Sequence, residues 1–96
     1  MDKTDQTTLT NNDLAMMFKA LSHPARIRII EYLKTMDHCI CGEIVSIFPL
    51  SQSTVSQHLK FLREAGLIRG EVDGPRMCYC LDRDTLELFK QAVTRL

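Results

Sequence analysis

Apolar residues recur at helical spacing over most of this 96-residue chain. The spacing predicts amphipathic helices, because positions three and four apart share one helix face. One helix is expected from Asp13, which can cap it, and another from Pro24, since proline is favoured in a first helical turn. The first apolar face comprises Leu14, Met17, Phe18 and Leu21, and the second comprises Ile27, Ile30 and Leu33, widened by Ile29 and Met36. These helices are expected to build much of the core.

A third, shorter helix is expected over about Cys41 to Phe48, and the turn at residues 49–51 leads into a fourth. Ser51 or Ser53 can cap the fourth helix, and Gly66 can end it in a left-handed conformation. Its apolar stripe consists of Val55, Leu59 and Leu62. Two helices joined by so short a turn form a helix-turn-helix.

The opposite face of the fourth helix carries short polar side chains, whereas a merely solvated helix is usually covered by Glu and Lys. This face comprises Gln52, Ser53, Ser56, Gln57 and Lys60. Hydroxyl and amide groups suit a partner with fixed donors and acceptors, as base edges in a major groove are. The pattern therefore predicts a recognition helix, and the alternative is a polar surface helix without a partner.

The apolar period changes after Gly66. Asp73-Gly74-Pro75 is a turn signal between two short strands, and a hairpin placed directly after a recognition helix is a wing. Alternation predicts an inner face of Met77, Tyr79 and Leu81 and an outer face of Arg76, Cys78 and Cys80. A last helix is expected from about Asp84, with Leu86, Phe89 and Val93 apolar.

The expected fold class is mainly α with a small β-hairpin, a winged helix-turn-helix of about five helices and a two-stranded wing. A chain of this length is one domain whose core would gain from dimerisation. Residues 1–12 are polar and are expected to form a flexible arm, and residues 13–96 the DNA-binding domain with its dimerisation helices.

The composition of the chain bears on its cellular compartment, on the state of its cysteines and on its affinity for DNA. No apolar run is long enough to cross a membrane, and the first residues lack a secretory pattern, which favours the cytoplasm. The four cysteines are then expected to rest as thiols, which favours metal or redox chemistry. Twelve basic and twelve acidic residues cancel. This balance predicts modest non-specific DNA affinity and a shallow salt dependence, and it is the argument for an alternative, a winged helix that binds protein.

The chain resembles the ArsR/SmtB family of small winged-helix repressors over nearly its whole length. The residues that carry the resemblance are Ala20–Ile29, Cys39-Ile-Cys41-Gly-Glu43, Leu50–Leu59 and Ala65–Ile68. The resemblance implies a homodimer built from the first and last helices. It also implies binding to double-stranded operator DNA, and release of that DNA when an inducer binds.

The positions that match the family's recognition helix are Gln52, Ser53, Thr54, Ser56, Gln57 and His58, and Arg76 matches the wing. Glutamines can make bidentate contacts with adenine edges, and hydroxyls can serve bases or phosphates. Lys60 is most simply a phosphate or solvent residue. His58 is either a DNA contact or a satisfied boundary histidine, and Arg76 either reaches the DNA or is solvated.

Cys39 and Cys41 match the paired thiols that open the third helix in the arsenic-sensing branch. Thiolates suit a soft ion such as As(III), Sb(III) or Cd(II) as inducer, and no cofactor is expected for DNA binding itself. On a regular helix, residues two apart point about 200° apart, so a shared ion would have to unwind the helix start. Binding would thus distort the DNA-binding motif.

One departure from the family pattern concerns the third thiol, because Ile44 stands where that cysteine is expected. His38 and Asp37 are the nearest other ligands. Thiol oxidation, persulfide sensing and structural cysteines therefore stay open as alternatives to metal sensing. Cys78 and Cys80 lie two apart on a strand, too far for a mutual disulfide, and are expected to be exposed and incidental. The sequence holds no phosphate loop, nucleophile elbow or catalytic carboxylate pair, so no enzyme is expected.

Overall fold

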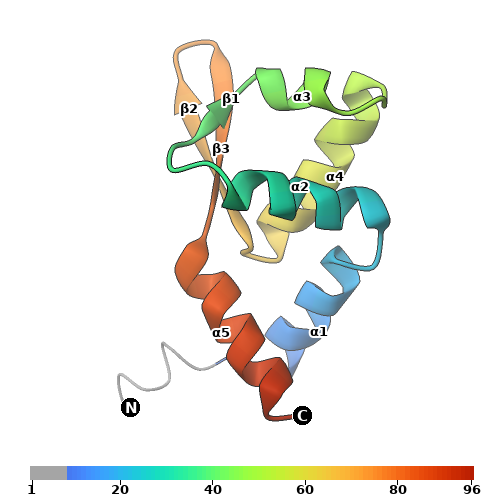
Figure 1. Ribbon diagram of the computed structural model, residues 1–96, viewed down its shortest axis with the longest axis vertical. Helices are drawn as coiled ribbons and strands as arrows, with labels where there is room; N and C mark the ends of the chain where they lie inside the picture. The colour runs from blue at the N-terminus through green and yellow to red at the C-terminus, as the bar shows by residue number, and fades with distance from the viewer. Residues whose placement is uncertain (1–8) are drawn as a thin grey trace.

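Capping side chains define the helix starts in the computed structural model, which describes residues 9–96 (Figure 1). Helix α1 spans Asn11–Ala20. The Thr10 hydroxyl accepts from the Asp13 backbone N–H at 3.0 Å, and the Asp13 carboxylate accepts from the Thr10 N–H at 3.1 Å. Asp13 is thus the third helical residue of a capping box and not the cap, and the helix starts earlier than the sequence predicted.

The other long helices begin at polar caps or at proline. Helix α2 (Pro24–Lys34) has Pro24 in its first turn, as expected. Helix α4 (Gln52–Glu64) is capped by Ser51, whose hydroxyl accepts from the Thr54 N–H at 3.2 Å. Helix α5 (Arg83–Thr94) is capped by Asp82, slightly earlier than expected. These four helices have 10 to 13 residues, and the fifth, α3 (Glu43–Ile47), has only 5.

Three antiparallel strands form one sheet in the order β1-β3-β2. They are β1 (Ile40–Cys41), β2 (Ile68–Asp73) and β3 (Arg76–Leu81). The hairpin of β2 and β3 is the predicted wing, and Gly74 in its turn has a φ of +64°. Strand β1 corrects the expectation that a helix begins at Cys41. Ile40 pairs with Tyr79 and is buried in the core, and Gly42, at a φ of +72°, separates the strand from α3.

The core joins side chains of all five helices to the inner face of the sheet, with Leu86 as the buried core residue of α5. Its fully buried large side chains are Ile29, Leu33, Ile44, Val55, Leu59, Leu62, Leu67 and Ile68. Tyr79 and Leu81 contact this core, which confirms the predicted alternation for both, whereas Met77 is 38% exposed. Ile27 was wrongly expected inside, because α2 packs through Ile29, Ile30 and Leu33 and leaves Ile27 44% exposed.

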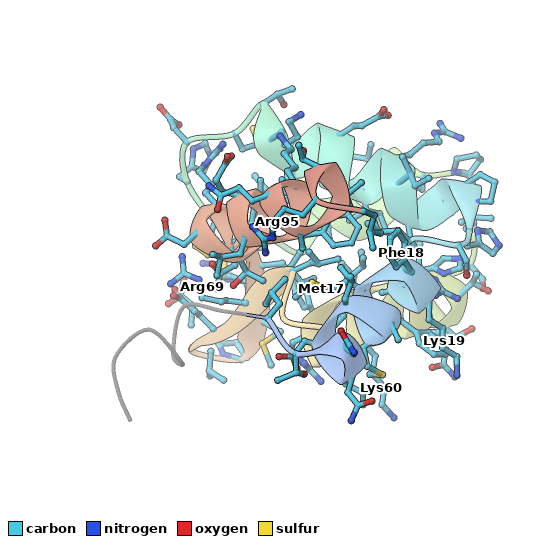
Figure 2. All side chains as sticks on the ribbon, turned by 90° about the horizontal axis from the view of Figure 1, so that it is seen from below. Met17, Phe18, Lys19, Lys60, Arg69 and Arg95 are labelled. Atoms are coloured by element: carbon cyan, nitrogen blue, oxygen red, sulfur yellow. A yellow bond between two sulfur atoms is a disulfide. The ribbon has the colours of Figure 1, made fainter. Side chains whose placement is uncertain are left out.

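Helices α1 and α5 lie together at one end of the molecule, with the wing and α3 at the other (Figure 1). The rings of Phe18 and Phe89 join these two helices edge to face, with centroids 5.3 Å apart. In Figure 2, Phe18 and Met17 lie on the side of α1 that faces α5. Met17 is nevertheless 3% exposed and Phe18 44%, so only part of the apolar face of α1 is exposed and free to join a dimer. No helix among residues 9–96 is long and apolar enough to cross a membrane.

Candidate nucleic-acid interface and cysteine cluster

Helix α4 presents one polar, exposed face. Val55, Leu59 and Leu62 lie at most 1% exposed on its inner side, as the sequence predicted. The outer side chains are all exposed, and they are Gln52, Ser53, Thr54, Ser56, Gln57 and Lys60. The hydroxyls of Ser51 and Thr54 are joined at 2.8 Å, so Thr54 also supports the start of the helix. The structure therefore brings together six of the seven residues predicted for the recognition helix.

His58 is the exception, because its side chain lies on the inner side and is 7% exposed. Its Nδ1 accepts from the Arg26 Nε–H at 3.1 Å, and its ring lies 4.5 Å from that of His23. Burial, and then the nearby His23 and Arg26, lower the pKa of His58. Of the two interpretations offered by the sequence, these surroundings fit a histidine whose hydrogen bond is satisfied within the protein better than they fit a DNA contact.

Arg26 is a structural residue that the sequence analysis missed. Its guanidinium lies 4.2 Å from the ring centroid of Phe61 in α4 and donates to the backbone carbonyls of Lys19 and Ala20 at the end of α1. One side chain of α2 therefore connects the end of α1 to α4. No pattern in a single sequence predicts this contact, because Arg26 and Phe61 are distant along the chain.

Arg76 lies at the tip of the wing, as predicted. Its Nη2 donates to the Asp73 carboxylate at 2.8 Å across the turn, and both side chains are more than half exposed. Such an exposed pair contributes little to stability, and the guanidinium stays accessible to a partner.

The four cysteines are joined across two strands. Cys41 lies directly opposite Cys78 in the register of β1 and β3. Cys39, two residues earlier, lies beside Cys80. The two Cα–Cα distances are 4.0 Å for Cys41–Cys78 and 4.4 Å for Cys39–Cys80, as at non-hydrogen-bonded positions of an antiparallel pair. Both pairs are disulfides, so all four sulfurs are bonded.

This arrangement corrects three expectations. Cys39 and Cys41 belong to a strand segment and not to a helix start, so the helical geometry expected for a shared ion does not apply. Cys78 and Cys80 are 4% and 7% exposed, and neither is an exposed, incidental thiol. The expected resting thiols are disulfides here. The signal available in the sequence was the repeated Cys-X-Cys spacing, which places two pairs in register when the segments lie antiparallel.

Carboxylates from β2 lie beside both sulfur pairs. Ligand atoms of Cys39, Cys80 and Glu71 lie within 4.8 Å of one another, and so do those of Cys41, Cys78 and Asp73. The Cys39 Sγ is 3.8 Å from Glu71 Oε1. Each group therefore combines two soft sulfurs with one carboxylate on the outer face of the sheet. Glu71 and Asp73 were not predicted, because only the β2–β3 register brings them here.

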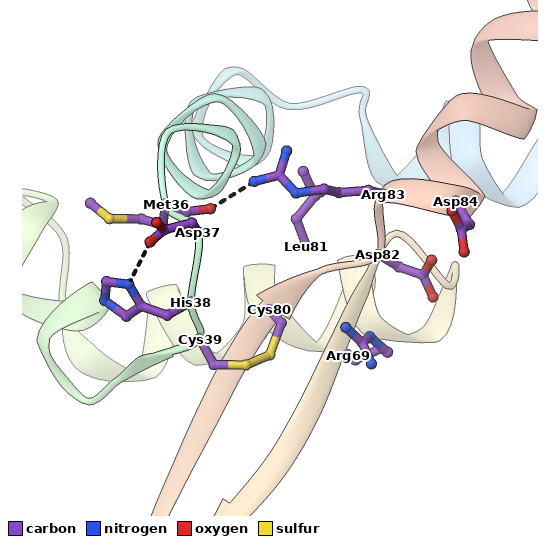
Figure 3. Close-up of a pocket in the computed structure, with 10 residues that line it drawn as sticks. All are labelled: Met36, Asp37, His38, Cys39, Arg69, Cys80, Leu81, Asp82, Arg83 and Asp84. Atoms are coloured by element: carbon purple, nitrogen blue, oxygen red, sulfur yellow. Dashed lines mark hydrogen bonds and ion pairs between the residues drawn. A yellow bond between two sulfur atoms is a disulfide. The ribbon is translucent and has the colours of Figure 1, made fainter.

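A pocket of about 380 Å³ opens beside the Cys39–Cys80 pair (Figure 3). Arg83 closes one side by donating to the carbonyl of Met36 at 2.6 Å. His38 and Asp37 line it, 3.1 Å apart, and this hydrogen bond lowers the pKa of Asp37. Small reagents can therefore reach this disulfide from solvent.

Comparison with known proteins agrees with this geometry. Residues 23–69, which include α2, α3 and α4, match the family described as bacterial regulatory protein, arsR family. The chain is 42% identical over 67 residues to the uncharacterized HTH-type transcriptional regulator Rv0081 of Mycobacterium tuberculosis. The match covers 70% of this chain and 59% of that relative, so the chain spans less than two thirds of the relative's length.

Two further matches cover a larger share of both aligned chains. The chain is 33% identical to the HTH-type transcriptional regulator YgaV of Escherichia coli, over 90% of this chain and 87% of YgaV. A crystal structure described as a possible transcriptional regulator for arsenical resistance superposes with a TM-score of 0.71. That protein is 29% identical, and the match covers 82% of this chain and 81% of its own.

Proposed function

The chain belongs to the ArsR family of bacterial regulatory proteins. On this basis we propose that it represses transcription by binding operator DNA, and that it dissociates from this DNA when a thiol-reactive inducer binds or modifies its cysteines. Members of this family are DNA-binding regulators and not enzymes. The observation that carries the proposal is the position of Cys39 and Cys41. They lie on a segment that pairs with the wing strand and leads directly into α3, the first helix of the DNA-binding motif.

The exposed face of α4 supplies the base contacts in this proposal. Gln57 and Gln52 read base edges, while the hydroxyls and Lys60 position the helix on bases and phosphates. Arg76 contacts a phosphate from the wing. His58 supports the helix from within and does not contact DNA.

The proposed repressor acts in the cytoplasm as a homodimer. Its domain was expected over residues 13–96 and an arm over residues 1–12, but Thr10 caps α1, so residues 10–12 belong to the domain. Residues 1–8 lie outside the described part of the chain, and residues 11–12 already belong to α1. Phe18 and Val93, both about 40% exposed, lie at the α1–α5 end of the molecule and support a dimer surface there. Two-fold symmetry would present two recognition helices to successive major grooves.

A soft metal or metalloid ion is the favoured inducer, with As(III), Sb(III) and Cd(II) as candidates. Two groups of paired sulfurs with a carboxylate support this choice. Relatives named as an arsenical resistance operon repressor of Staphylococcus xylosus and a cadmium resistance regulatory protein homolog of Staphylococcus aureus support it further.

Thiol oxidation is the second candidate, because the sulfurs are placed to form two cross-strand disulfides. Disulfides in a reducing cytoplasm are usually transient, and their formation can act as a signal. One similar solved structure, 28% identical, is described as reduced HlyU from Vibrio cholerae, so a redox state is specified for that protein.

Titration of the reduced protein against its own upstream DNA tests the proposal. We expect binding to one fragment that weakens with salt, and release on addition of arsenite, Cd²⁺ or a thiol oxidant. No specific binding at low salt would reject the repressor function, and the effective reagent would choose between the two inducer classes.

A further inference from the structure

We propose that the reduced protein binds two soft divalent cations per chain, one at Cys39, Cys80 and Glu71 and the other at Cys41, Cys78 and Asp73. The inference rests on the proposed function only in that it names the ligand sites of the same cysteines. It goes further by adding β3 and β2 to the site and by fixing the stoichiometry. Cation binding can be measured without DNA, so it can fail or succeed independently of repression.

The ligand atoms of each group lie close enough to reach one cation once the disulfide is reduced. Ligand atoms around a tetrahedral zinc ion lie about 3.3–3.8 Å apart, given ligand bonds of about 2.0–2.3 Å. The Cys39 Sγ and Glu71 Oε1 are already 3.8 Å apart, and all three ligand atoms of each group lie within 4.8 Å. The two sulfurs of each group are bonded to each other here, so after reduction they must move apart to this spacing. Rotation about side-chain bonds can supply this movement and bring the carboxylate onto the ion.

Strand geometry keeps the two groups separate. Cysteines two apart on one strand are separated by about 6.5–7 Å, whereas cysteines directly opposite each other on adjacent strands have Cα atoms 4.0–4.4 Å apart. The sulfurs therefore converge in cross-strand pairs and not as one four-sulfur group. The carboxylates follow the same repeat, because Glu71 and Asp73 are also two apart on β2.

Reduction must precede binding, because a bonded sulfur pair lacks two thiolates. A dithiol reductant opens each disulfide by forming its own, and the protein gains two thiols. Each thiol then releases its proton as the cation binds. The pocket beside Cys39 and Cys80 gives small reagents a route to that pair.

The two sites are expected to fill in order. The Asp73 carboxylate is engaged by Arg76 at 2.8 Å, whereas the Arg69–Glu71 distance is 4.0 Å. A cation therefore competes with a closer guanidinium at the Asp73 site. We expect the Glu71 site to bind the first ion.

Titration of the reduced full-length chain with Cd²⁺, followed by sulfur-to-cadmium charge-transfer absorbance and calorimetry, tests this inference. The wild type should bind two ions per chain and the Cys41→Ser/Cys78→Ser variant one. Glu71→Gln should weaken the first site by about tenfold or more. Glu71 is exposed, so this variant tests the carboxylate without disturbing the core.

Glu87→Gln, an equal change at an exposed carboxylate of α5, is the control and should not alter either site. One ion bound to four thiolates, or no ion, would overturn the inference. So would a Glu71→Gln titration indistinguishable from that of Glu87→Gln. Binding of arsenite alone, which needs thiolates only, would likewise reject the carboxylate ligands.

Discussion

The Arg26 guanidinium donates to Nδ1 of His58 over 3.1 Å, and this hydrogen bond joins α2 to the buried side of the recognition helix. The bond requires a histidine nitrogen with a free lone pair, which a protonated ring lacks. The exposed face of α4, which we propose binds DNA, is therefore supported by a residue that must stay neutral.

This requirement predicts acid sensitivity. The pKa of His58 is lowered from 6.5 in the folded protein by burial, and further by His23 and Arg26. As pH falls through 6.5, His58 therefore binds a proton more readily in the unfolded chain than in the folded protein. The free energy of unfolding should decrease over this range until the pH has passed the lowered pKa of the folded state. Denaturant unfolding at pH values above and below 6.5 measures this loss.

The matched variant is His58→Gln, whose amide oxygen can still accept from Arg26 but does not titrate. It should lose less stability on acidification than the wild type. His38→Gln changes an exposed histidine and should behave as the wild type does. Equal acid destabilisation of the wild type and His58→Gln would contradict the role given to His58.

Gln57→Ala tests base recognition. If its amide reads a base edge, the variant should lose about 1–3 kcal/mol on the operator. Affinity for a scrambled duplex of equal length, measured by fluorescence anisotropy, should stay nearly unchanged. An equal loss on both duplexes would make Gln57 a positioning residue.

Arg76→Ala tests the wing. Loss of a phosphate contact should weaken binding to both duplexes and lower the slope of log affinity against log salt by about 1. Asp73→Asn, which removes the ion-pair partner of Arg76, should instead strengthen binding to both duplexes. An unchanged salt slope in Arg76→Ala would remove Arg76 from the interface.

Val93→Asp tests the dimer surface. Val93 is 39% exposed at the end where α5 packs on α1, so a charge there should disrupt a partner contact without entering the core. Sedimentation at micromolar concentration should show a dimer for the wild type and a monomer for the variant. A monomeric wild type with full operator affinity would reject the homodimer.

The sequence predicted most of the fold because the fold depends on local patterns. The stripe of Val55, Leu59 and Leu62, the Ser51 cap and the Gly74 turn all lie where expected. The prediction of a helix from Cys41 was wrong, because a two-residue strand has no sequence period of its own and exists only through pairing with β3. The sulfur pairs and the nearby carboxylates depend on register between distant segments, which local patterns do not contain.

The central claim is that the cysteines control release of DNA. Cys39→Ser with Cys41→Ser leaves α4 and Arg76 unchanged, so the reduced variant should bind an operator duplex with wild-type affinity in an anisotropy titration. Cys78→Ser with Cys80→Ser should behave in the same way, because each cross-strand pair takes one cysteine from the β1 segment and one from β3. Inducer should release the wild type and leave both variants bound. Release of the Cys39→Ser/Cys41→Ser variant at the wild-type inducer concentration would contradict the claim.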